Sequence, residues 1–132
     1  MPLTDQEIAS YARKRNPMNH PTVMYKKSAV EAAGSYSEEF HLFEDYHLWV
    51  RMIMKGYKAA NLPETLVYMR TPEDFYKRRG GAEYAQDMLR FHGWMKSEGF
   101  TNTMIYLTGA VPHAIVCRLP VSLRKAVYKV LH

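Results

Sequence analysis

The stretch that decides the fold spans residues 43–54 and reads Phe43-Glu44-Asp45-Tyr46-His47-Leu48-Trp49-Val50-Arg51-Met52-Ile53-Met54. Its apolar side chains recur at helical spacing: Leu48, Trp49, Met52 and Ile53. Gly56 follows as a typical helix end. Glu44 and Asp45 fall in the first turn, where free backbone N–H groups favour negative charge. The pair is either an acidic helix start that complements the dipole or a carboxylate positioned as a general base.

Composition places the chain among globular proteins with anionic partners. Its 132 residues suit one domain, and 47% of them are apolar. The net charge of +5 favours nucleotides, nucleic acid or a membrane surface. The single cysteine, Cys117, excludes an internal disulfide and fits a reducing compartment. Because the first residues are polar and no apolar run approaches about 18 residues, we expect a cytoplasmic protein.

Local signals predict a mixed order of elements. Thr4-Asp5-Gln6-Glu7 and Ser28-Ala29-Val30-Glu31 are capping-box patterns, each predicting a short helix. The β-rich runs 22–25, 57–62 and 65–70 predict strands. From Pro72 onward the pattern is helical, with helices expected over 82–97, over 101–119 with an interruption at Pro112, and from Pro120 to the end.

This order predicts an α/β fold, mixed and rich in helix. Three short strands are too few for a free-standing sheet, so they read as one edge of a larger sheet. We expect residues 1–70 to belong to that α/β unit and residues 71–132 to form a helical extension.

Three sequence blocks carry a resemblance to a known family. The first is Arg15-Asn16-Pro17-Met18-Asn19-His20-Pro21-Thr22-Val23-Met24-Tyr25-Lys26-Lys27-Ser28, ahead of Ala33-Gly34-Ser35-Tyr36. The second is Glu44-Asp45-Tyr46-His47-Leu48-Trp49-Val50-Arg51-Met52. The third is Asn61-Leu62-Pro63-Glu64-Thr65-Leu66-Val67-Tyr68-Met69-Arg70. In this order and spacing they resemble the C-terminal half of family 2 glycosyltransferases of bacterial polysaccharide synthesis.

The resemblance implies the acceptor-side half of an inverting enzyme with a GT-A fold. Asp45 would be the base that deprotonates the acceptor hydroxyl, with Glu44 orienting the acceptor or Asp45 itself, and His20 is a candidate substrate contact. The partners implied are a nucleotide sugar and a saccharide or lipid-linked acceptor, with divalent Mg or Mn in the full-length enzyme. For His20, a hydrogen bond within its own loop is an equal alternative.

The chain departs from the family pattern in two ways. His47 stands where the family usually has a second acid, and no Asp-x-Asp pair for metal and diphosphate occurs. The nucleotide-binding strands that precede this region in the family are also absent. We therefore expect a truncated product or fragment that does not turn over alone, because nothing neutralises the leaving group.

Other clusters have functional and structural interpretations. Arg78 and Arg79 precede Gly80-Gly81, so they are candidate contacts to a diphosphate or lipid phosphate. Arg13-Lys14-Arg15 is interpreted as a solvated face, and Trp49 as core. His41, Glu44 and His47 lack the spacing of known zinc sites, so no metal site is predicted.

The C-terminal sequence is basic and amphipathic. No acidic residue follows Glu98, and residues 118–132 combine apolar and cationic positions. This pattern suits peripheral contact with the inner membrane face, or packing on the preceding helices. The alternative function is a non-catalytic basic module that binds nucleic acid or a membrane, and a third is a pseudo-enzyme serving as an interaction surface. No nucleic-acid-binding pattern appears, so nucleic acid is not expected as a partner.

Overall fold

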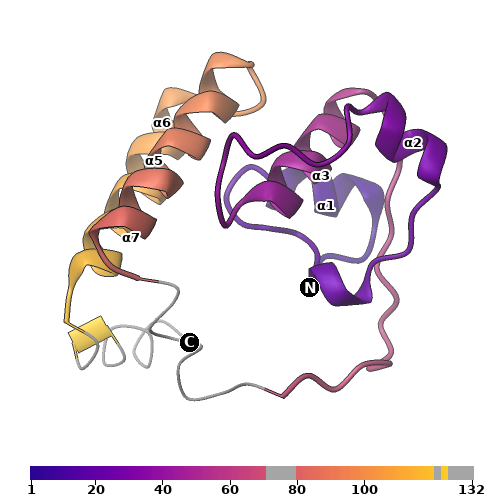
Figure 1. Ribbon diagram of the computed structural model, residues 1–132, viewed down its shortest axis with the longest axis horizontal. Coiled ribbons are helices and arrows are strands. Elements are labelled where there is room, and N and C mark those ends of the chain that lie inside the picture. The colour runs from indigo at the N-terminus through magenta and orange to yellow at the C-terminus, as the bar shows by residue number, and fades with distance from the viewer. Residues whose placement is uncertain (71–79, 121–122, 125–132) are drawn as a thin grey trace.

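The computed structural model describes residues 1–70, 80–120 and 123–124, and within them the chain is helical with no strand. In chain order the elements are α1 (Asp5–Tyr11), the 3-10 turn η1 (His20–Thr22), α2 (Lys27–Ala32), α3 (Glu44–Met54), α5 (Ala82–Ser97), α6 (Thr103–Ile105), the π-helical η2 (Tyr106–Ala110) and α7 (Val111–Arg118). Figure 1 shows α1, α2 and α3 grouped together, with α5, α6 and α7 forming a helical hairpin beside them.

The α/β prediction is wrong for the described residues. Residue 22 ends the turn η1, and residues 23–25, 57–62 and 65–70 are neither helix nor strand. β-Propensity reflects fit to a paired, half-buried surface, and these runs find no neighbouring strand there. Leu66 and Tyr68 are 70% and 90% exposed. The backbone of residues 59–61 bonds instead to the N-terminal segment, where Asn61 N–H donates to the Leu3 carbonyl at 3.0 Å.

Local capping signals succeed at two helices and fail at a third. Thr4 Oγ1 accepts from Glu7 N–H and the Glu7 carboxylate accepts from Thr4 N–H, which confirms the first capping box. Helix α3 begins at Glu44 as predicted, and Gly56 follows it at φ +82°. The second capping box is wrong, because α2 begins at Lys27 and therefore encloses Ser28.

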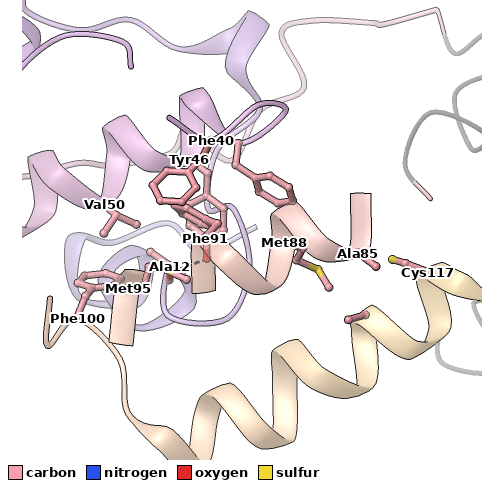
Figure 2. Close-up of a cluster of buried hydrophobic side chains, with 12 residues drawn as sticks. Ala12, Phe40, Tyr46, Val50, Ala85, Met88, Phe91, Met95, Phe100 and Cys117 are labelled. Carbon is pink, nitrogen blue, oxygen red and sulfur yellow. Dashed lines mark hydrogen bonds between the residues drawn. The ribbon is translucent and has the colours of Figure 1, made fainter. Parts of the chain in front are cut away.

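Phe91 of α5 lies at the centre of the core. Its ring centroid is 5.4 Å from that of Phe43 and 4.7 Å from that of Tyr46. Tyr46 also donates its hydroxyl to the buried Ala12 carbonyl at 2.6 Å, which joins α3 to the end of α1. Figure 2 shows α5 between the α3 side of the cluster and the helix that carries Cys117. The core thus contains residues from both sides of position 70, and the division into two domains stays a prediction.

A smaller cluster and a clamp fix the loop between α2 and α3. Leu48 and Trp49 pack against Val30 and Ala33. The Arg51 guanidinium donates to the carbonyls of Ala33 and Ser35, the residues that flank Gly34. Gly34 has φ +87°, and a Cβ there would stand 2.9 Å from Arg51 Nη1, so position 34 favours glycine.

The hairpin largely follows its prediction. Helix α5 has the predicted bounds, and Gly99 at φ +74° follows it. The helix expected over 101–119 is interrupted by the π-helical η2, which ends two residues before Pro112, and not at Pro112 itself. This proline sits in the first turn of α7, directly after η2, and a π turn is one way in which a helix accommodates freed backbone groups. The start of the helical pattern, from Pro72 to residue 79, and most of the helix predicted after Pro120 lie outside the described residues.

Candidate functional site

Asp45 is held by hydrogen bonds in the first turn of α3. Its Oδ2 accepts from Asn16 Nδ2 at 2.9 Å, and its Oδ1 accepts from the Tyr46 N–H at 2.7 Å. Asn16 Oδ1 in turn accepts from the Met18 N–H, so the amide of Asn16 is fixed at both ends. Asp45 is half-buried, whereas the neighbouring Glu44 is exposed. The carboxylate therefore has a defined orientation before any substrate arrives.

Aromatic side chains gather one turn further along α3. Trp49 follows Asp45 by four residues, so both lie on the same face of the helix. The rings of His20 and Tyr25 each lie 6.1 Å from that of Trp49, and His20 Nε2 is 2.8 Å from the Tyr36 hydroxyl. The predicted residues His20, Glu44 and Asp45 thus lie in one region of the molecule.

Tyr36 connects the aromatic group to the carboxylates electrostatically. Burial raises the pKa of Tyr36, and the neighbouring Tyr25, Asp45 and Glu44 raise it further. Negative charge beside a phenol disfavours its ionisation, so Tyr36 keeps its proton at neutral pH. Its neutral hydroxyl is shared with His20 Nε2, at 2.8 Å, and with the Tyr25 side chain.

His47 points away from Asp45. A separation of two residues corresponds to about 200° around a helix, which turns His47 toward α5. Its ring lies 4.9 Å from Phe40 and 4.4 Å from Trp94, and it is buried. Burial and, to a smaller extent, the nearby Arg51 together lower the pKa of His47 to about 4. The departure from the family pattern at position 47 therefore lies on the core side of α3, away from the Asp45 carboxylate.

Two shallow grooves occur elsewhere on the surface. One, of about 590 Å³, is lined by Gly34, Ser37, Glu39, His47, Arg51, Met54, Lys55, Trp94 and Glu98. The other, of about 670 Å³, lies along the N-terminal segment and α1. Neither groove includes Asp45 or His20, so the candidate site is identified by its hydrogen bonds and not by a cavity.

The remaining predicted residues are not part of this region. Arg78 and Arg79 lie outside the described residues. At Gly80, the guanidinium of Arg124 occupies the space that a Cβ would take, and Arg124 is buried. Across residues 1–70, 80–120 and 123–124, no group of three His, Cys, Asp or Glu side chains is placed to hold a metal ion. The described residues therefore do not fit the divalent ion that the family resemblance implies.

Asn16, Tyr25 and Tyr36 belong to the sequence blocks that resemble the family, but the sequence predicts no role for them. Asn16 could have been found only through its position next to Pro17, in the same loop as the candidate contact His20. Its partner Asp45 is 29 residues away, and no local pattern links the two. The interpretation of Trp49 as a core residue is confirmed, because its side chain is buried among α2 and α3 residues.

Comparison with known proteins decides the family. The family model described as "Glycosyl transferase family group 2" matches residues 7–123. The chain belongs to this family. Within the described ranges, no helix is long and apolar enough to cross a membrane. No solved structure matches the chain significantly.

Curated relatives include bacterial glycosyltransferases of polysaccharide synthesis. The amylovoran biosynthesis glycosyltransferase AmsE of Erwinia amylovora is 34% identical over 109 residues, covering 80% of this chain and 41% of its own length. The UDP-Gal:alpha-D-GlcNAc-diphosphoundecaprenol beta-1,3-galactosyltransferase of Escherichia coli is 32% identical over 122 residues, with coverage of 92% and 44%. An uncharacterized glycosyltransferase of Haemophilus influenzae is 43% identical over 86 residues, with coverage of 65% and 31%. The chain therefore spans less than half the length of these relatives.

Proposed function

We propose that this chain is the acceptor-side part of an inverting glycosyltransferase with a GT-A catalytic domain, acting in cell-surface polysaccharide synthesis. The donor would be a nucleotide sugar and the acceptor a saccharide or lipid-linked hydroxyl. The observation that carries the proposal is the Asp45 carboxylate, held by Asn16 at 2.9 Å in the first turn of α3. The family match supports the reaction class, and the Escherichia coli relative is named for a UDP-sugar donor and a diphosphoundecaprenol-linked acceptor.

Asp45 would act as the general base. As the acceptor oxygen forms its bond to C1 of the donor sugar, its proton passes to Asp45, and the bond from C1 to the diphosphate oxygen breaks on the opposite face. Asn16 leaves the carboxylate one orientation, which reduces the entropy lost on reaching the reactive geometry. Glu44, being exposed beside Asp45, would orient the acceptor.

The residues around Asp45 would hold the acceptor in place. His20 and the Tyr36 hydroxyl are joined at 2.8 Å and present polar groups on the Asp45 side of α3. Arg78 and Arg79 would contact the diphosphate or a lipid phosphate, a role that suits guanidinium groups. Mg or Mn would bind in the remainder of a full-length enzyme and neutralise the leaving diphosphate. We therefore expect residues 1–132 alone not to turn over, and the enzyme to work in the cytoplasm at the inner membrane face.

A chimera tests the proposal. Residues 7–123 would replace the matching segment of the Escherichia coli relative, and sugar transfer would be measured with its nucleotide sugar and lipid-linked acceptor. Asp45→Asn should lower kcat by a factor of about 100 to 10,000 with little change in KM, the range typical of a lost general base. Glu31→Gln serves as a control, because Glu31 is an exposed carboxylate of α2 that pairs with Lys27.

A second variant separates the base from its support. Asn16→Ala keeps the Asp45 carboxylate but removes its hydrogen bond, so kcat should fall by a smaller factor, about 10 to 100. Circular dichroism would check that each variant keeps its helices. An active chimera whose kcat is unchanged by Asp45→Asn would show that another group takes the proton.

A further inference from the structure

Along α6, η2 and α7, large apolar side chains are exposed and small ones are buried, the opposite of the usual arrangement on a surface helix. Small residues face α5, where Ala110, Ala114 and Cys117 are buried. Large apolar side chains face outward instead: Met104 is 73% exposed, Leu107 55% and Ile115 61%. A helix on the surface of a water-soluble domain normally buries its large apolar side chains and exposes charged ones.

The apolar residues on this side of the helix form a row, in which Met104, Leu107 and Ile115 are exposed and Val111 is half-buried. Met104, Leu107, Val111 and Ile115 recur every three or four residues along α6, η2 and α7. We define these four residues as the outer stripe. Residues Thr103 to Arg118 form helical turns throughout, so at about 1.5 Å per residue the stripe runs along a helix roughly 24 Å long.

Charge along this segment has one sign. Between Thr101 and Leu119 the only Asp, Glu, Lys or Arg is Arg118, which is exposed at the end of α7. No acidic residue occurs anywhere after Glu98. An apolar face that ends in a cation complements an anionic surface with a hydrophobic interior, whereas a protein partner would not require the absence of acids.

We propose that the outer stripe lies in the interface of an anionic lipid bilayer. Met104, Leu107, Val111 and Ile115 enter the acyl boundary, and Arg118 contacts the anionic headgroups. The helix lies on the bilayer and does not cross it, since no described helix is long and apolar enough to span. The apolar part of this surface lies ahead of residues 118–132, for which the sequence predicted membrane contact, and the two share only Arg118. It is also independent of the proposed catalytic role, because α5 lies between the helix that carries Cys117 and the α3 residues Tyr46 and Val50 (Figure 2).

Vesicle binding of the 132-residue chain tests the proposal. The chain would be sedimented with phosphatidylcholine vesicles with and without phosphatidylglycerol, and the partition coefficient measured. We expect binding to the anionic vesicles, and a fall of about tenfold or more for the double variant Leu107→Asn and Ile115→Asn. The matched control is Leu62→Asn with Leu66→Asn, which removes two aliphatic side chains that are more exposed than Leu107 and Ile115 and lie elsewhere. The control should bind as the parent does.

Two further measurements keep the outcome decisive. Arg118→Gln should weaken binding to anionic vesicles and leave binding to neutral ones unchanged, because it removes only the headgroup contact. If the double variant loses its helical circular dichroism, Met104→Asn replaces it, since Met104 is the most exposed member of the stripe. Absence of vesicle binding, or binding equal in parent and stripe variants, would overturn the proposal. So would a dimer in sedimentation velocity that the stripe variants dissociate, which would assign the face to a second copy of the chain.

Discussion

Mild acid should destabilise this protein through a buried histidine. His92 of α5 is buried, with its ring 5.7 Å from that of Phe91 and 6.3 Å from that of Tyr46. Burial and, to a smaller extent, the nearby His113 together lower the pKa of His92 from 6.5 to about 4. The folded chain therefore resists a proton that the unfolded chain accepts below pH 6.5. The free energy of unfolding must fall as the pH drops from 6.5 toward 4.

The size of the loss follows from the two pKa values. With a folded pKa of about 4 and an unfolded pKa of 6.5, His92 alone removes about 2 kcal/mol of stability between about pH 7 and pH 5. This is a large part of the roughly 5–15 kcal/mol that stabilises a typical domain. His47 acts in the same direction, because its pKa is lowered to about 4 as well, and so does His113.

Urea unfolding followed by circular dichroism at several pH values between about 7 and 5 measures the effect. The variant His92→Gln keeps a polar side chain that does not titrate. The slope of its free energy of unfolding against pH should therefore be smaller than that of the parent, by the contribution of about one bound proton. His41→Gln is the control, because His41 is exposed in the loop before α3. Equal slopes for the parent and His92→Gln would refute the burial argument, and so would a parent that gains stability on acidification.

Three further predictions concern stability and the site loops. Thr4→Ala removes the N-cap of α1 and should cost about 1 kcal/mol in urea unfolding. The pKa of Glu7 should stay lowered in an NMR titration, because the backbone N–H groups of residues 4 and 3, which lower it most, remain in the variant. Gly34→Ala should cost about 1–2 kcal/mol, because φ is +87° and the Cβ meets Arg51. The control Gly93→Ala, in the middle of α5 with open space around its Cβ, should instead stabilise by about 0.5–1 kcal/mol, and the same sign for both would contradict the assignment of strain. Arg51→Met should lower kcat in the chimera without unfolding it, because the Ser35 carbonyl loses its donor and Tyr36 its fixed position; unchanged transfer would show that the clamp is dispensable.

Signals that act within one or two turns could be read from the sequence. The capping box at Thr4, the acidic start of α3 at Glu44 and the glycine after each of α3 and α5 all involve residues less than five positions apart. The α3 helix that carries Asp45 was therefore predictable with its bounds. Ser28 misled because the same four-residue pattern also fits inside a helix, and only the backbone at Lys26 decides where α2 begins.

Features that depend on distant partners could not be read. The runs 57–62 and 65–70 have the composition of strands, but a strand exists only through hydrogen bonds to another segment. The hydrogen bond between Asn16 and Asp45 and the contact of His20 with Tyr36 each join loops that tertiary packing brings together. His47 shows the same limit, since its position in the sequence suggests the site while its direction on the helix assigns it to the core.

Cys117 can serve as an intrinsic probe of how often α7 separates from α5. It is the only cysteine in the chain, 1% exposed, and it lies where α7 meets α5. A thiol reagent in solution reaches such a sulfur only when α7 separates from α5, so the labelling rate measures the free energy of that local opening. Comparing it with global unfolding would tell whether the hairpin detaches alone or melts together with α3. Labelling in the presence of anionic vesicles would further show whether a bilayer against the outer stripe slows that opening.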